Sequence, residues 1–161
     1  MSRWNNKIVI FDLDGTLAVI DNRRALAGVT PGSPQKTNPQ MNWDVFLDPK
    51  NIDLDLPNQP VIDMLNMIDN TDRYQIWILS GRSDVTQDAT IDWLDKYGIR
   101  YDNLIMRPKK HHYMPDNDFK QMVLDDIGVD NVVMVFDDRQ QVVDMWRKNG
   151  ITCFQVADGN F

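Results

Sequence analysis

Residues 8–16 read Ile8-Val9-Ile10-Phe11-Asp12-Leu13-Asp14-Gly15-Thr16. The first four, all apolar, predict a buried strand, and two carboxylates follow where that strand ends. Because side chains alternate along a strand, Asp12 and Asp14 lie on the same side of the backbone, and Gly15 permits a sharp turn. Such a pair is costly to keep unless a cation or a phosphoryl group lies between the two acids. The stretch therefore predicts a site at the carboxyl end of a strand, where open α/β sheets bind ligands.

Strand-like and helix-like segments alternate along the rest of the chain. The predicted strands cover residues 7–12, 75–80, 103–106, 132–137 and 151–156. The predicted helices cover residues 61–69, 84–97, 116–127 and 139–149, and the last three each run up to a glycine. This alternation predicts a single α/β domain over residues 1–161, with three layers built around a central, mainly parallel five-stranded sheet.

The segment 18–59 breaks the alternation. It holds five of the eight prolines together with many Asn, Asp and Gly residues, which favour turns. We expect an irregular insertion with a short helical piece around 42–47, from which Trp43, Phe46 and Leu47 pack on the main body. A connection of this length is often functional, but it is too short for an independent lid. We therefore expect only a minimal cap, which leaves room for the end of a polymer.

The charge of the chain limits its partners. With 17 Lys and Arg against 24 Asp and Glu, the formal net charge of −7 argues against broad attraction to nucleic acid. Any polyanion must be bound by a local basic patch. The stretch 107–115, with Arg107, two lysines and two histidines, is the most basic of the chain, although such a run is equally often a solvated face.

Cysteine content and hydropathy indicate the compartment. Cys153 is the only cysteine, so an internal disulfide is impossible and a reducing compartment is the simplest interpretation. No apolar run has the length of a membrane span, and residues 1–6 lack the apolar core of a signal peptide. We expect a cytoplasmic protein without membrane contact.

Further polar residues stand at the ends of later strands. Ser80-Gly81-Arg82 offers a hydroxyl, a guanidinium and backbone amides to a phosphate, although Ser-Gly at a strand end is more often a simple turn. Asp137 and Asp138 close the fourth strand, where Asp138 can equally be a helix N-cap. Lys120, early in the preceding helix, can equally be an exposed surface lysine.

A parallel sheet brings these groups to one edge. Three carboxylates, a hydroxyl and an ammonium group then converge there, namely Asp12, Asp14, Ser80, Lys120 and Asp137. Carboxylate oxygens suit a hard divalent cation such as Mg²⁺, while the hydroxyl and the ammonium suit phosphoryl oxygens. The convergence favours a functional role for each residue over a merely structural one.

The same residues resemble a family of phosphatases. Asp-x-Asp-Gly-Thr, a later Ser or Thr, a Lys and a closing acidic pair form the pattern of the haloacid dehalogenase (HAD) superfamily. It is matched in order by residues 12–16, Ser80, Lys120 and Asp137-Asp138. The resemblance implies a Rossmann-like HAD fold and a Mg²⁺-dependent phosphomonoesterase.

The resemblance also implies a role for each matched residue. Asp12 is the nucleophile that forms an aspartyl-phosphate, and Asp14 protonates the leaving oxygen and then activates water. Ser80 and Lys120 hold the phosphate oxygens. The implied Mg²⁺ ligands are Asp12, the backbone carbonyl of Asp14, Asp137 and, through a water or else only as a helix cap, Asp138.

A narrower resemblance concerns the 3'-phosphatase domain of phage polynucleotide kinase-phosphatases. It is carried by Arg23, Ser80-Gly81-Arg82, Asp116 four residues before Lys120, and the runs 137–147 and 153–161. It implies removal of a 3'-phosphate from a nucleic acid end or a nucleotide, in the cytoplasm of the host cell if the chain is phage-encoded. The implied substrate-binding residues are Arg23, Arg82, Thr16, Gly81 and Asp116, the last by holding Lys120 in place.

Several alternatives stay open. No Gly-x-x-x-x-Gly-Lys-Ser/Thr motif occurs in the sequence, so we expect phosphatase activity without 5'-kinase activity, alongside a separate kinase or ligase. One rival is a 5'- or 3'-nucleotidase acting on free mononucleotides. Another is a noncatalytic phosphate-binding module, against which Asp14 argues because a binder needs no proton donor there. The sequence predicts neither the oligomeric state nor a preference for DNA or RNA.

Overall fold

The computed structural model describes residues 7–29 and 41–159. The expectation about residues 1–6 lies outside these residues, as does the middle of the predicted insertion, 30–40. Among the described residues, no helix combines the length and the apolar character that a membrane span requires.

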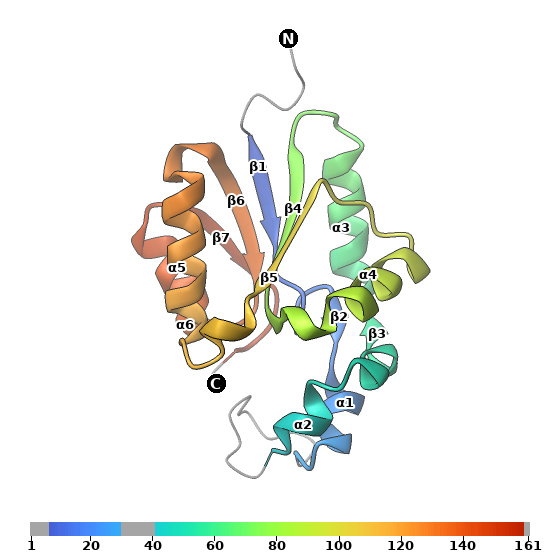
Figure 1. The fold of residues 1–161 in the computed structure, drawn as a ribbon. Coiled ribbons are helices and arrows are strands. Elements are labelled where there is room, and N and C mark those ends of the chain that lie inside the picture. The colour runs from blue at the N-terminus through green and yellow to red at the C-terminus, as the bar shows by residue number, and fades with distance from the viewer. Residues whose placement is uncertain (1–6, 30–40, 160–161) are drawn as a thin grey trace.

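A five-stranded sheet forms the centre of the molecule (Figure 1). Its strands run in the order β5 (Asn103–Arg107), β4 (Gln75–Ser83), β1 (Ile8–Phe11), β6 (Val132–Asp137) and β7 (Thr152–Gln155). All four neighbouring pairs are parallel. This arrangement confirms the predicted fold class. It also places the carboxyl ends of β1, β4 and β6 beside one another, at the edge where the polar residues stand.

The central strand β1 is buried on both faces because all four of its residues are apolar. Val9 and Phe11 belong to one hydrophobic core, and Ile8 and Ile10 to the other. On the first face lie α3 (Gln59–Asp69) and α4 (Gln87–Lys96), and on the second lie α5 (Asp116–Ile127) and α6 (Gln140–Lys148). These four helices match the predicted ones, except that residues Asp84–Thr86 form a separate 3-10 turn before α4. Two further 3-10 turns, Lys109–His111 and Val129–Asn131, precede α5 and β6.

The segment 18–59 is more regular than its composition predicts. Two short strands, β2 (Ala18–Val19) and β3 (Leu56–Pro57), pair antiparallel at its two ends. Between them lie α1 (Asp21–Leu26), α2 (Trp43–Phe46) and a 3-10 helix, Pro49–Leu54. Strands of two residues carry no readable alternation, so their pairing could not be predicted from the sequence.

The short helix expected around 42–47 is present as α2, but one of its expected contacts is wrong. Phe46 is buried and Leu47 packs against the core, whereas Trp43 keeps 48% of its surface exposed. The Asn42 side chain caps the helix by accepting hydrogen bonds from the Asp44 and Val45 amides. A four-residue helix can turn only one narrow face to the core, and Phe46 occupies it.

Helix α3 offers a matched test of the core. Leu65 is fully buried, while its neighbour Met64 is 39% exposed. We expect Leu65→Ala to lower the free energy of unfolding by about 2 to 5 kcal/mol because it leaves a cavity, and Met64→Ala to lower it by less than about 1 kcal/mol. Denaturant titration of both variants measures this, and equal losses would contradict the assigned burial.

Candidate active site

Lys120 is the centre of a buried charge cluster at the carboxyl edge of the sheet. Its Nζ lies 2.9 Å from Asp12 Oδ1 and 2.9 Å from Asp137 Oδ2. The side chain is only 1% exposed, so the alternative of a surface lysine is wrong. Burial alone would lower the pKa of Lys120, but the surrounding carboxylates outweigh burial and hold this pKa well above its ordinary value.

Asp138 joins this cluster through the turn that follows β1. The Thr16 hydroxyl donates to Asp12 Oδ2 at 3.1 Å and to Asp138 Oδ1 at 3.4 Å. Gly15 has a φ of +81°, and a Cβ at this position would lie 2.2 Å from Asp138 Oδ2. Glycine is therefore required both for the backbone conformation and for the close approach of the carboxylate.

The acidic residues of the cluster fit a divalent cation. Asp12, Asp137 and Asp138 are all buried, and each offers a carboxylate oxygen within 4.8 Å of the other two. Three carboxylates and one ammonium leave a formal charge of −2, which one Mg²⁺ would neutralise with the oxygen ligands it prefers. Burial and the nearby Asp12 raise the pKa of Asp137 to about 6 against the opposing effect of Lys120, as expected where carboxylates are crowded. The role of the Asp14 carbonyl as a ligand stays a prediction.

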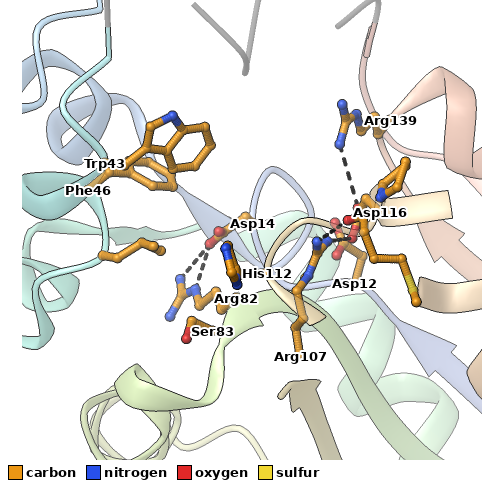
Figure 2. Close-up of a pocket in the computed structure, with 14 residues that line it drawn as sticks. Asp12, Asp14, Trp43, Phe46, Arg82, Ser83, Arg107, His112, Asp116 and Arg139 are labelled. Carbon is orange, nitrogen blue, oxygen red and sulfur yellow. Dashed lines mark hydrogen bonds and ion pairs between the residues drawn. The ribbon is translucent and has the colours of Figure 1, made fainter. Parts of the chain in front are cut away.

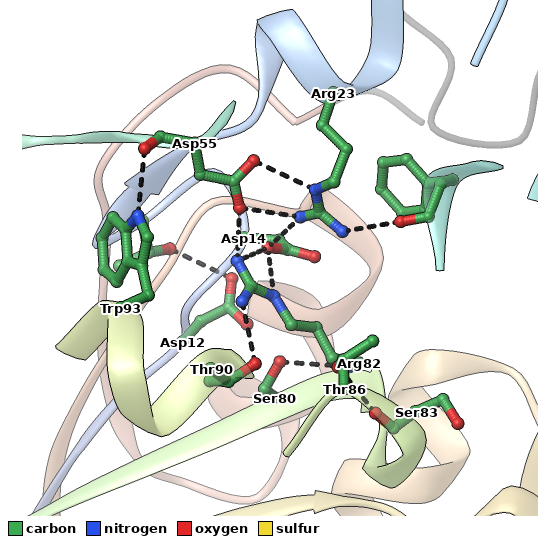
Figure 3. Close-up of polar contacts among 12 residues, drawn as sticks. Asp12, Asp14, Arg23, Asp55, Ser80, Arg82, Ser83, Thr86, Thr90 and Trp93 are labelled. Carbon is green, nitrogen blue, oxygen red and sulfur yellow. Dashed lines mark hydrogen bonds and ion pairs between the residues drawn. The ribbon is translucent and has the colours of Figure 1, made fainter. Parts of the chain in front are cut away.

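Asp14 belongs to a second charge network, on the side of the insertion (Figure 3). Its Oδ1 accepts hydrogen bonds from Arg23 Nη2 and from Arg82 Nε, both at 2.8 Å. Both arginines also bind Asp55: Arg23 through Nε at 3.0 Å and Nη2 at 3.1 Å, and Arg82 through Nη2 at 2.7 Å. The carboxylate of Asp14 is thereby oriented by two guanidiniums that a second carboxylate holds.

Asp55 is the residue of this network that sequence reasoning missed. It is fully buried, and its backbone carbonyl accepts a hydrogen bond from Trp93 Nε1 at 3.0 Å. Burial and the neighbouring Asp14 raise the pKa of Asp55 to about 6, while Arg23 and Arg82 oppose the shift. Asp55 lies in a segment with loop composition, and its hydrogen-bond partners are 27 to 38 residues away along the chain, so no local pattern predicts its role.

The structure assigns both arginines partners within the protein. Arg23 is fully buried, and its Nη1 donates to the Phe46 carbonyl at 3.1 Å. Arg82 is also buried, and its Nη1 donates to Thr90 Oγ1 at 3.0 Å. Their predicted contact with a phosphate stays a prediction.

The remaining predicted residues lie between the two networks. Ser80 is buried, and its hydroxyl accepts a hydrogen bond from the Arg82 amide at 3.0 Å. A Cβ on Gly81 would lie 2.3 Å from Asp116 Oδ1, so glycine is needed there to admit the carboxylate. Asp116 binds Arg107 at 2.9 Å and lies 3.9 Å from Lys120, so its predicted support of Lys120 is the weaker of the two contacts.

Both networks face one cavity of about 570 Å³ (Figure 2). Asp12, Asp14, Gly81, Arg82 and Ser83 line its polar part. Trp43 and Phe46 of α2 and the following Leu47 line one part of it, while Arg107, His112, Met114, Pro115, Asp116 and Arg139 line it elsewhere. Figure 2 shows the α2 aromatic residues on the side of Asp14, and Arg107, Asp116 and Arg139 on the side of Asp12. Of the predicted basic stretch, Arg107 and His112 line the cavity.

Comparison with known proteins identifies the family. The family described as the polynucleotide kinase PNKP phosphatase domain matches residues 36–161. The chain belongs to this family. The matched part includes Lys120 and Asp137 of the first charge network, Asp55 of the second, and Ser80.

Individual relatives agree with this membership. The chain is 30% identical over 158 residues to a protein named "Putative bifunctional polynucleotide kinase/RNA ligase" from Autographa californica nuclear polyhedrosis virus, covering 94% of this chain and 19% of the viral protein. A solved structure of a Pnkp1/Rnl/Hen1 complex superposes with a TM-score of 0.72 at 34% identity, covering 97% of this chain and 47% of that one. The chain thus spans less than half the length of either relative.

A more distant structure supports the fold alone. An HAD family enzyme from Bacteroides thetaiotaomicron, solved in complex with magnesium and inorganic phosphate, superposes with a TM-score of 0.53 at 14% identity. The alignment covers 96% of each chain. It confirms the HAD-like arrangement of the sheet and its helices.

Asp55 provides a sharp test of the second network. We expect Asp55→Asn to lower kcat for hydrolysis of a phosphomonoester by at least about 100-fold, because it removes the charge that holds both arginines against Asp14. Asp53→Asn is the matched control, since Asp53 forms only an exposed ion pair with Lys96. Steady-state kinetics of both variants measures the effect, and full activity of Asp55→Asn would contradict the assigned role.

The acidic cluster predicts a metal-dependent melting temperature. Mg²⁺ binding only to the folded state should raise Tm by mass action, and Asp138→Asn should remove most of this increase. Asp130→Asn, at an exposed position, should retain it. Thermal melts with and without Mg²⁺ provide the measurement, and an equal increase in both variants would exclude Asp138 as a ligand.

Proposed function

We propose that the protein is a Mg²⁺-dependent phosphatase that removes the 3'-phosphate from nucleic acid ends. The main support for this proposal is that the neighbouring carboxylates of Asp12 and Asp14 lie in different charge environments. Asp12 is paired with Lys120 beside the acidic cluster, while Asp14 is paired with two arginines on the side of the insertion. One motif thus supplies two carboxylates that can do different chemistry on one substrate.

Asp12 acts as the nucleophile in this proposal. One of its oxygens attacks phosphorus in line, the bond between phosphorus and the sugar oxygen breaks, and an aspartyl-phosphate forms. Asp14, protonated on Oδ2 because Oδ1 accepts hydrogen bonds from both arginines, gives this proton to the departing sugar oxygen, which becomes a hydroxyl. Asp14 then takes a proton from the water that attacks phosphorus, and the bond between phosphorus and the Asp12 oxygen breaks. Release of inorganic phosphate leaves Asp12 as a carboxylate and Asp14 protonated again.

The residues around the two acids stabilise the transferred group. Ser80 and Lys120 hold the phosphoryl oxygens, and Arg23 and Arg82 fix the direction of Asp14. Asp12, Asp137 and Asp138 would hold Mg²⁺, which when bound supplies positive charge that draws electron density from a phosphoryl oxygen.

Two features support a nucleic acid end as the substrate. The family is that of a polynucleotide kinase phosphatase domain, and the viral relative carries kinase and ligase in its name. The cavity also receives positive charge from Arg107 and Arg139, both close to Asp116, in a chain whose net charge is −7. Among the residues that line the cavity, Arg82, Arg107 and Arg139 thus balance the three aspartates, so the site repels a polyanion less than the chain as a whole does.

The relatives also suggest the step that follows. Ligases join a 3'-hydroxyl to a 5'-phosphate, so a phosphatase acting on 3' ends would convert blocked ends into ligatable ones. We propose that the protein works ahead of an end-joining reaction, with a ligase acting on the same ends.

A substrate panel tests the proposed function. We expect release of phosphate in Mg²⁺ from 3'-phosphorylated DNA or RNA oligonucleotides, with at least about 100-fold lower kcat/KM on the same oligonucleotides carrying a 5'-phosphate. Treated 3' ends should become substrates for an added ligase. A higher kcat/KM on free 3'-mononucleotides would support the nucleotidase alternative, and hydrolysis of none of the phosphomonoesters would support a binding module.

Asp12→Asn tests the nucleophile. The variant is nearly isosteric and should lower kcat by at least about 1,000-fold while leaving the circular dichroism spectrum unchanged. Turnover that persists after deamidation has been excluded by mass spectrometry would remove Asp12 from this role.

A further inference from the structure

Trp43 is an aromatic side chain that the fold does not bury. It keeps 48% of its surface exposed, and of the large apolar side chains exposed on the described residues it is the one that lines the 570 Å³ cavity. Other large apolar side chains are as exposed, so what distinguishes Trp43 is its place in the cavity, where its ring is available to a ligand. The catalytic roles proposed above make no use of it.

The Trp43 side chain is held in place by ring packing and by the hydrogen bonds of its helix. Its ring meets Phe46 edge to face, with centroids 5.7 Å apart and an interplanar angle of 88°. Phe46 is buried, and the Arg23 guanidinium lies over its ring at 4.2 Å from the centroid. The Asn42 cap fixes the start of the helix, and the Asn42 amide donates to the Ala27 carbonyl at 2.8 Å. An aromatic ring held in this way can receive a flat ligand with little loss of side-chain entropy.

Arg23 connects the aromatic wall formed by Trp43 and Phe46 to Asp14, the proposed general acid. It donates to the Phe46 carbonyl through Nη1 at 3.1 Å and to Asp14 Oδ1 through Nη2 at 2.8 Å. The wall therefore has a fixed position relative to the carboxylate that protonates the leaving sugar oxygen. Figure 2 shows Trp43 and Phe46 on the same side of the cavity as Asp14, away from Arg107 and Arg139.

We propose that Trp43 stacks on the base of the 3'-terminal nucleotide, an inference that rests on the proposed function. With the phosphate at Asp12 and the sugar oxygen at Asp14, the terminal base continues toward α2, where the exposed indole face stands. Stacking on an aromatic ring tolerates every base, because each has a π face, so the contact recognises a terminal nucleotide without reading its sequence. The neighbouring polymer is then directed toward the opposite side of the cavity, which carries Arg107 and Arg139.

The test compares two 3'-phosphorylated oligonucleotides that differ only in the presence of the terminal base. Trp43→Ala should raise KM about tenfold for the oligonucleotide with a normal terminal nucleotide, with little change in kcat, and should raise KM less than twofold for the one with an abasic terminal sugar. Trp43→Phe should retain most of the affinity, and Trp43→Leu, which keeps apolar bulk without a ring, should behave like Trp43→Ala.

Phe154→Ala is the matched control, because Phe154 is also 48% exposed but lies on β7 outside the cavity lining. It should leave both KM values unchanged. An equal KM for wild type and Trp43→Ala on the normal end, or an equal rise on both ends, would overturn the stacking role while the phosphatase activity stands. Failure of the wild type to hydrolyse either oligonucleotide would instead overturn the proposed function, and the inference with it.

Discussion

Buried charge at the carboxyl edge of the sheet is the constraint on which this structure depends. Asp12, Lys120 and Asp137 are almost fully removed from water, and an isolated ion in such a place would be very unfavourable. Each therefore needs an oppositely charged partner at hydrogen-bond distance, and each has one. The parallel sheet makes this pairing possible because β1 and β6 end side by side with α5 packed across them. The parallel sheet thus brings the charged side chains together, and their ion pairs fix the relative positions of β1, β6 and α5.

The insertion is tied to the sheet in the same way. Asp55 from the insertion holds Arg23 from α1 and Arg82 from β4, and both arginines meet again at Asp14. Loss of any member would leave an uncompensated charge in the interior. Through Arg23 the network also reaches Phe46, so one side chain links the wall of the cavity to the proposed acid. The described part of the insertion thus helps to shape the site, since Trp43 and Phe46 line the cavity beside Asp14.

Much of this arrangement could be predicted from the sequence, because apolar runs and strand-end acids are local signals. The five strands, the four main helices and the meeting of Asp12, Lys120 and Asp137 all follow from them. The pairing of β2 with β3, the burial of Asp55 and the exposure of Trp43 do not. They depend on contacts between distant residues in a segment whose composition indicates only turns. An aspartate after a helical turn looks the same in the sequence whether it caps the next element or holds two arginines.

The central claim is that Asp12 forms the bond to phosphorus at a nucleic acid 3' end. The most direct measurement is an acid quench within the first turnover, with excess protein and an oligonucleotide that carries a radiolabelled 3'-phosphate. We expect transient label on the protein, removable by hydroxylamine as an acyl phosphate is, located on the peptide that contains Asp12 and absent from Asp12→Asn. Release of labelled phosphate with no labelled protein at any time, or label on another residue, would contradict it.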